Sequence, residues 1–218
     1  MHFEVPKAKS FKEFGGEYLM IVISIITALA LEHAVQTWHH RHLAHQAATR
    51  IDAEMQANVQ ELDKVLAHNK AEVKKLNILH DQLLAGLKAK EDSRALARRL
   101  TGDGKFGGLS IQVPALRREA WEVAIASQAA SWMTQQQLER YSGIYANMRD
   151  IQTLAAGGGT VFLNGPEMLN VVGDINIGEG DAKAVYHIVR QMVSAYDSID
   201  GNLQSLRDDL AKAADTSH

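Results

Sequence analysis

Apolar residues are concentrated in one stretch near the start of the chain. The run from Tyr18 to Leu31 has 14 residues, a length that fits a membrane span, a buried helix or the core of a signal peptide equally well. Continued to Trp38 the segment has 21 residues, which as a helix cover about 31 Å, enough to cross the hydrocarbon layer of a bilayer. Tyr18 and Trp38 would then lie at the two interfaces, where amphipathic aromatic rings are favoured. The pattern therefore predicts a polar leader at 1–16 and one transmembrane helix at 17–38.

A cleaved secretory signal is the competing interpretation of the same stretch. The tripeptide Ala28-Leu29-Ala30 provides a small-x-small site after an apolar run. The segment before that run, however, carries three glutamates beside its three lysines, which is a poor match to a basic signal-peptide start. We therefore favour an uncleaved span.

The basic residues around the span predict its orientation. Lys7, Lys9 and Lys12 precede it, whereas Arg41 and Arg50 are the only basic residues within about 20 positions after it. Because positive charge is retained on the cytoplasmic side, the N-terminus is predicted to be cytoplasmic. In a bacterium this places the span in the inner membrane and the C-terminal region in the periplasm.

Small and polar residues recur along one side of the predicted span. Ser24, Ala28, Glu32, Gln36 and His40 are spaced by four and form a stripe on one helix face. Helices in lipid associate through such faces, because small side chains allow close approach and polar ones hydrogen-bond across the contact. The stripe is predicted to face protein. Alternatively, Ser24 and Thr27 bond their own backbone and Glu32 lies at headgroup level.

Histidines cluster directly after the span. His39, His42 and His45 follow one another at intervals of three, so that neighbouring imidazoles could share a face and reach one metal ion or a haem edge. No HExxH motif is present, and no carboxylate or cysteine joins the cluster at ligand spacing. The alternative is an interfacial collar whose partly protonated rings meet lipid phosphates.

Residues 39–100 are predicted to form a helical stalk that resembles a coiled coil. No glycine or proline lies between Tyr18 and Leu84, so the span and the stalk are expected to form one helix. Asn69 and His80 fall on the apolar seam, where a polar residue usually fixes register or oligomeric state. The seam has the alternating spacing of four and three of a heptad repeat, at Met55, Val59, Leu62, Leu66, Asn69, Val73, Leu76, His80, Leu83 and Leu87.

The remaining residues, 101–218, predict a small helical bundle with glycine-rich loops. Residues 106–113 include strand-like positions but are too short to indicate a sheet. Pro114 is expected to open a helix over 115–130, and Thr134 with Gln137 forms a capping-box pattern for a helix to about Leu154.

Two further helices are expected near the C-terminus. Pro166 could start a short helix to Val172. Asp181 is a plausible N-cap for the last helix, which is long enough to lie antiparallel along the stalk. The fold class is thus mainly α.

Composition and motifs exclude several functional classes. A net charge of −3 and the lack of a concentrated basic face argue against nucleic-acid binding. The absence of cysteine excludes disulfides, thiolate nucleophiles and iron–sulfur clusters. The glycines at 157–159 are not followed by the lysine of a phosphate loop, which argues against a nucleotide, and no serine lies in a GxSxG elbow. We therefore expect no cofactor and no enzymatic activity.

Two segments carry a resemblance to other proteins. The pattern FKEFGGEYLMIVISIITALALEHAVQTWHHRHLAHQAATRIDAEMQANVQEL, with LRREAWEVAIASQAASWM downstream, resembles a group of uncharacterised bacterial single-pass membrane proteins with a short leader, one N-terminal span, a helical stalk and a later AWE-containing helix. The resemblance covers residues 11–62 and 116–155. It implies an inner-membrane protein and brings no activity or site residues, and the histidine-rich collar departs from the group's usual Arg, Lys and Glu. Trp121 and Glu122 match the AWE motif, and Trp121 is interpreted as a core anchor.

Two functional hypotheses follow from these features. In the first, the protein is a non-catalytic accessory or scaffold protein that assembles with other membrane-protein subunits, or with itself, through its span and stalk. In the second, His39, His42 and His45 hold a metal or redox cofactor, and the protein is a sensor or an electron-transfer accessory.

Overall fold

The protein is almost entirely helical in its computed structural model, which describes residues 11–102, 106, 110–158 and 165–215. No strand occurs in these residues, which agrees with the predicted mainly α class. Residues 1–10 of the leader, most of the glycine-rich loop before Ser110 and the third glycine of 157–159 lie outside the described residues. The elements in chain order are α1 (Phe11–Lys88), α2 (Ser93–Thr101), α3 (Glu119–Ala126), the 3-10 helix η1 (Ala129–Trp132), α4 (Gln135–Gly158), α5 (Gly165–Asn176) and α6 (Ala182–Asp215).

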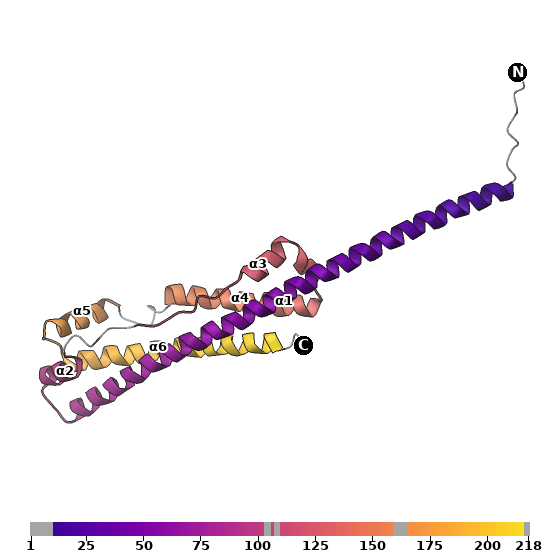
Figure 1. Cartoon of the computed structure of the whole chain (residues 1–218). Helices are drawn as coiled ribbons and strands as arrows, with labels where there is room; N and C mark the ends of the chain where they lie inside the picture. Colours follow the sequence, from indigo (N-terminus) through magenta and orange to yellow (C-terminus); the bar gives the residue numbers. More distant parts are fainter. Residues whose placement is uncertain (1–10, 103–105, 107–109, 159–164, 216–218) are drawn as a thin grey trace, which may run out of the picture.

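Helix α1 dominates the molecule. It has 78 residues, a length of about 117 Å at the α-helical rise, and it runs without a break from the apolar stretch into the region predicted as the stalk. Figure 1 shows its N-terminal part extending alone beyond the bundle, while the other helices gather around its C-terminal part. The expectation of one continuous helix is confirmed.

The end of α1 corrects the predicted stalk boundary, because the helix ends at Lys88 and not near residue 100. Lys90 adopts the left-handed conformation with φ 58°, and the N–H groups of Lys90 and Glu91 donate to the carbonyls of Leu87 and Gly86 over 3.1 Å each. This is a Schellman turn. Since a lysine occupies the position where glycine is usual, the sequence offers no capping residue for this stop, although the heptad seam itself ends at Leu87.

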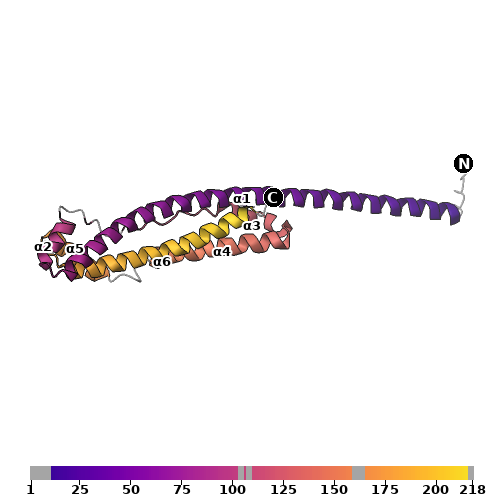
Figure 2. The same cartoon turned by 90° about the horizontal axis from the view of Figure 1, so that it is seen from below.

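Helices α4 and α6 lie alongside α1, and α6 runs back along it so that the C-terminal end of α6 lies near the middle of α1 (Figure 2). The expectation that the last helix lies antiparallel along α1 is confirmed, since α6 packs more extensively against α1 than any other element does. Two hydrophobic clusters result. The proximal cluster, nearer the protruding part of α1, includes Ile51, Met55, Leu62, Tyr141, Met148 and Leu206, and the distal cluster includes Leu83, Leu96, Val185, Ile188 and Met192.

An extended segment, residues 110–118, replaces the start of the helix predicted over 115–130, and α3 begins only at Glu119. Two asparagines of α1 hold this segment. Asn69 accepts from the Gln112 N–H over 3.0 Å and donates to the Gln112 carbonyl over 3.2 Å. Asn58 makes the same pair of bonds with Arg117, both over 2.9 Å. Each side-chain amide therefore bonds both the N–H and the carbonyl of one residue, as the backbone of an adjacent β-strand does.

Each of these paired contacts between an asparagine side chain and a backbone is termed an asparagine clamp. The distance between the two clamps is the same along α1 as along the extended segment. Asn58 and Asn69 are 11 residues apart on a helix, about 16.5 Å along its axis, and Gln112 and Arg117 are five residues apart in extended backbone, also about 16.5 Å. The segment therefore runs antiparallel to α1, and Pro114 is buried between the two clamps.

The predicted helix starts are confirmed where they rest on local capping. Thr134 and Gln137 exchange hydrogen bonds before α4, with Thr134 N to Gln137 Oε1 at 3.1 Å and Gln137 N to Thr134 Oγ1 at 3.2 Å. Asp181 caps α6 by accepting from the Ala184 N–H over 2.9 Å. The hydroxyl of Ser93 donates to the same carboxylate over 2.7 Å, which ties α2 to α6 and, with the backbone bond from Ala184, lowers the pKa of Asp181.

Helix lengths differ from the expected ones by a few residues. The helix expected to end near Leu154 continues to Gly158, and the short helix expected over 166–172 spans Gly165–Asn176. Such shifts at helix ends are ordinary, because terminal residues carry weak signals.

Candidate functional site: the uncovered helix and the bundle end that meets it

The N-terminal part of α1 protrudes beyond the bundle and exposes most of its large apolar side chains. Residues 15–39, termed the uncovered helix, contain no buried residue; His40 is the first position with a ring contact to another helix, and Ala44 is the first buried position. An 18-residue window within α1 has a mean hydropathy of 2.0 and none of it is buried. It is the one helix of the described residues that is long and apolar enough to cross a membrane. Since none of the window is buried, α1 does not resemble the core helix of a soluble protein here.

Aromatic residues stand near both ends of this apolar surface. Tyr18 and Trp38 are 63% and 67% exposed, and the exposed large apolar residues between them range from 54% for Ile25 to 67% for Met20. Single exposed apolar residues are common on soluble proteins, but a contiguous apolar surface along most of a long helix indicates contact with lipid or protein.

The first four residues of the predicted polar stripe lie on the uncovered helix, and the hydrogen bonds of Ser24, Glu32 and Gln36 are local, whereas the fifth, His40, stacks on Trp132 of η1. Ser24 Oγ donates to the Met20 carbonyl over 2.8 Å, as the alternative interpretation of Ser24 proposed. Gln36 Nε2 donates to Glu32 Oε1 over 3.1 Å. Ala28 is exposed. The stripe therefore presents one small residue and one side-chain pair to whatever surrounds the helix.

The predicted histidine trio does not converge in this chain. His42 stacks on Trp38 with ring centroids 5.7 Å apart, and its Nε2 lies 2.8 Å from the side-chain nitrogen of Gln46. His39 is exposed, and His45 lines a groove farther along α1. Within the described residues, no three side chains of the metal-binding types stand together as a ligand group.

His40, which is not part of the predicted trio, contacts another helix of the chain. His40 stacks face to face on Trp132 of η1, with ring centroids 3.6 Å apart and planes 5° from parallel. This pair joins the turn between α3 and α4 to the start of the covered part of α1. Sequence reasoning missed Trp132, and its only local signal was a tryptophan in a segment without charged side chains.

The two polar seam residues have their contacts inside the chain. Asn69 is fully buried, and besides its clamp on Gln112 it donates to Asp200 Oδ1 of α6 over 2.9 Å. His80 stacks on Tyr186 of α6 at a centroid distance of 5.0 Å, and its Nδ1 lies 3.1 Å from Asp81 Oδ1. The prediction that Asn69 and His80 form an assembly surface is corrected for this reason: α6 and the extended segment of the same chain already occupy the seam.

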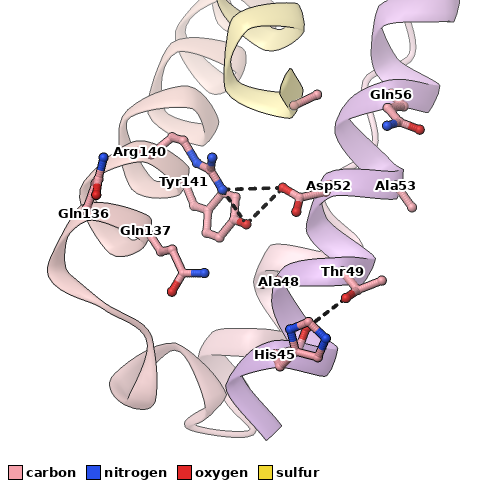
Figure 3. Close-up of a pocket in the computed structure, with 11 residues that line it drawn as sticks. His45, Ala48, Thr49, Asp52, Ala53, Gln56, Gln136, Gln137, Arg140 and Tyr141 are labelled. Carbon is pink, nitrogen blue, oxygen red and sulfur yellow. Dashed lines mark hydrogen bonds and ion pairs between the residues drawn. The ribbon is translucent and has the colours of Figure 1, made fainter. Parts of the chain in front are cut away.

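A groove of about 610 Å³ lies between α1 and the start of α4 (Figure 3). Its polar centre is formed by Asp52 of α1 with Arg140 and Tyr141 of α4. The Tyr141 hydroxyl donates to Asp52 Oδ1 over 2.9 Å, Arg140 Nη2 donates to the Tyr141 oxygen over 2.8 Å, and the same guanidinium nitrogen lies 3.6 Å from Asp52 Oδ1. The charges of Asp52 and Arg140 therefore compensate each other within the groove.

A second polar contact lies next to this groove. The Tyr145 hydroxyl donates to Glu54 Oε1 over 2.5 Å, and Glu54 Oε2 accepts from the Ala120 N–H over 2.9 Å. Burial, then the carboxylate that each phenol faces, raises the pKa of Tyr141 and of Tyr145. Both phenols stay neutral and act as hydrogen-bond donors, so that these groups lock α1, α3 and α4 together rather than provide a nucleophile.

Trp121 lies where the sequence predicted, against the proximal cluster. Its ring stacks on Tyr145 with centroids 5.6 Å apart and planes 10° from parallel, and it lies 6.4 Å from the Tyr141 ring. The half-buried indole thus connects α3 to α4.

Comparison of the chain with models of protein families, with curated proteins and with solved structures finds no match.

Proposed function

We propose that this protein is a non-catalytic accessory or scaffold protein of a membrane, anchored by a single helix at residues 17–38. The observation that carries the proposal is the uncovered helix: its hydropathic window has a mean hydropathy of 2.0 and no buried residue, whereas the same helix is covered by a bundle from Ala44 onward. Lipid satisfies such an apolar surface without any change in the fold.

The chemistry of the bundle supports a structural role. Its polar centre at Asp52, Arg140 and Tyr141 is internally compensated, and the two buried phenols are held in their neutral form. A catalytic site usually keeps an acid, base or nucleophile poised for proton transfer. The bundle is proposed to act through its shape and its surface, and no reaction is assigned to it.

Assembly through the span is proposed to use the polar stripe. If Trp38 marks the interface, Glu32 lies six residues or about 9 Å inside the hydrocarbon layer. Polar side chains at such depth usually face other protein helices, where they find hydrogen-bond partners. The Glu32–Gln36 pair with Ala28 beside it therefore favours contact with the span of another subunit or of a second copy. Assembly through the stalk is not part of this proposal, because α6 and the extended segment of the same chain occupy the seam.

The orientation and location of the protein are part of the same proposal. Three lysines before the span and two arginines after it favour a cytoplasmic N-terminus. In a bacterium this orientation would put the bundle in the periplasm, and the resemblance to single-pass bacterial proteins implies that the membrane is the inner one. Cleavage at Ala28-Leu29-Ala30 is distinguished from an uncleaved span by the intact mass of the protein purified from membranes.

Cysteine crosslinking in native membranes tests assembly through the stripe, because the chain itself has no cysteine. Ala28→Cys places a thiol on the stripe. Ala30→Cys is a matched control, since it changes the same residue type about 160° away on the helix. Self-assembly predicts a disulfide-linked dimer for Ala28→Cys and much less for Ala30→Cys.

Native mass in a mild detergent tests assembly with other subunits. A particle that contains other membrane subunits at a fixed ratio supports the accessory role. A monomer in detergent, together with no crosslink at either cysteine, would refute assembly through the span. Recovery of the protein in the soluble fraction would refute the anchor itself.

A further inference from the structure

The turn between α3 and α4 lies beside the point where the proposed span leaves the membrane. We propose that this turn, residues 123–138 and here termed the interfacial turn, is a second contact with the same bilayer and rests among the lipid headgroups. The inference depends on the proposed anchor at residues 17–38. Its partner is the lipid interface, and the contact would fix how the bundle stands on the membrane.

The stacking of Trp132 on His40 sets the depth of the interfacial turn. The ring centroids are 3.6 Å apart, and His40 follows Trp38 by two residues, about 3 Å along the helix axis. The headgroup region on each side of the hydrocarbon layer is about 5–8 Å thick. With Trp38 at the edge of the hydrocarbon, Trp132 therefore lies within the headgroup region.

The bundle has no spacer that could lift it away from the membrane. Ala44, the first buried residue of α1, lies six residues or about 9 Å beyond Trp38. Because α1 is one continuous helix through this point, the end of the bundle is held at that distance. Figure 1 shows α3 and the start of α4 at the end of the bundle that faces the protruding part of α1.

The composition of the interfacial turn fits a lipid interface. Residues 123–138 form a run of 16 without a charged side chain, between Glu122 and Glu139. Val123 and Ile125 are each 53% exposed and Trp132 is 48% exposed. Tryptophan is enriched at membrane interfaces because its ring is amphipathic. A turn that faced only water would have little reason to expose these side chains and to lack charge.

Single-tryptophan variants test the depth of the interfacial turn, because the chain has three tryptophans in different predicted environments. The full-length protein is reconstituted at low protein-to-lipid ratio in phosphatidylethanolamine and phosphatidylglycerol vesicles that contain lipids brominated near the headgroup end of the acyl chain. Each variant keeps one tryptophan and carries Phe at the other two positions. Trp121 is the internal control, since its stacking partner Tyr145 bonds Glu54, about 24 Å beyond Trp38 along α1.

We expect the brominated lipid to quench Trp132 by an amount of the same order as Trp38, and to leave Trp121 unquenched. Quenching of Trp38 without quenching of Trp132 would overturn the interfacial turn and leave the anchor standing. Failure to quench Trp38 would overturn the anchor and this inference together. A blue-shifted but unquenched Trp132 would mean that protein covers the turn, which also refutes a lipid contact.

A second measurement does not depend on the tryptophan substitutions. Ser131→Cys, next to Trp132, carries a nitroxide spin label in the otherwise unchanged chain, and Ser142→Cys on the exposed face of α4 is the control. The label at 131 is expected to be accessible to oxygen dissolved in the lipid phase, and the label at 142 to a water-soluble paramagnetic reagent. Equal accessibility of both labels to the aqueous reagent would overturn the proposal.

Discussion

Replacement of Asn69 by alanine is expected to destabilise the bundle strongly, although the residue lies on a seam that resembles an assembly surface. Asn69 is fully buried. Its amide bonds the N–H and the carbonyl of Gln112 over 3.0 and 3.2 Å and donates to Asp200 over 2.9 Å. The substitution removes all three bonds and leaves their partners in a partly buried setting.

The magnitude follows from these three bonds. Two neutral hydrogen bonds contribute about 1 kcal/mol each, and one to a carboxylate contributes about 1.5 kcal/mol or more. Because Gln112 is exposed and its backbone can partly rehydrate, we take about 3 kcal/mol as the expected loss for Asn69→Ala. With a urea dependence of about 2 kcal/mol per molar for a domain of this size, the unfolding midpoint should fall by about 1.5 M.

Pulse proteolysis of the full-length protein in a mild detergent with increasing urea measures this midpoint. Asn77→Ala is the matched control, because Asn77 is an exposed asparagine of the same helix and surface substitutions usually change stability by less than about 0.5 kcal/mol. Native mass is recorded for both variants, so that a change of assembly is separated from a change of stability.

Two results would refute this reasoning. An Asn69→Ala variant as stable as Asn77→Ala would show that the clamp on Gln112 contributes nothing. A variant with unchanged stability but altered oligomer size would return Asn69 to an interface between chains, as the heptad pattern first suggested.

Three further predictions concern single side chains. Gly201→Ala should stabilise α6 by about 0.5–1 kcal/mol, because a Cβ at this helical position meets no atom of another element within 4 Å. Gly86→Ala should not stabilise α1, because its Cβ would lie 2.6 Å from a side-chain carbon of Leu96 in α2. Urea unfolding midpoints of the two variants test this difference. Tyr145→Phe should cost about 1.5 kcal/mol through the lost bond to Glu54. Burial raises the pKa of Tyr145, so that the folded state keeps the phenol proton at pH values where the unfolded state loses it. Above pH 10.0, the ordinary pKa of tyrosine, the free energy of unfolding of the wild type should therefore fall more steeply than that of Tyr145→Phe. Burial likewise raises the pKa of Asp200. Wild-type stability should therefore fall as the pH rises from 3.8, the ordinary pKa of aspartate, through the raised pKa of Asp200, and Asp200→Asn should lack this fall. Urea unfolding midpoints across the acid range measure this difference.

Local signals were sufficient for much of the helical architecture. The lack of glycine and proline predicted one continuous helix through the apolar stretch, and Thr134 and Asp181 predicted two helix starts through their capping side chains. These features depend on residues within four positions of each other. The same reasoning failed at Lys90, because a left-handed lysine ends α1 where the pattern offers no glycine.

The candidate site likewise combines features that are visible in the sequence with contacts that are not. The apolar stretch and the stripe that includes Glu32 are visible in sequence, because lipid contact requires only a run of apolar residues of sufficient length. The stacking of Trp132 on His40 and the clamp of Asn58 on Arg117 join residues that are 92 and 59 positions apart. No local pattern predicts such pairs.

The sequence by itself determined that this chain is helical, that one stretch suits a bilayer, and that the stalk carries an apolar seam. Only the tertiary structure decided what covers that seam. Heptad periodicity indicates that one face of a helix is buried. The pattern is the same whether the helix that covers this face belongs to another chain or to this one. Here the buried amide of Asn69 is satisfied by Gln112 and Asp200 of the same chain, because the chain turns at Lys90 and returns along α1.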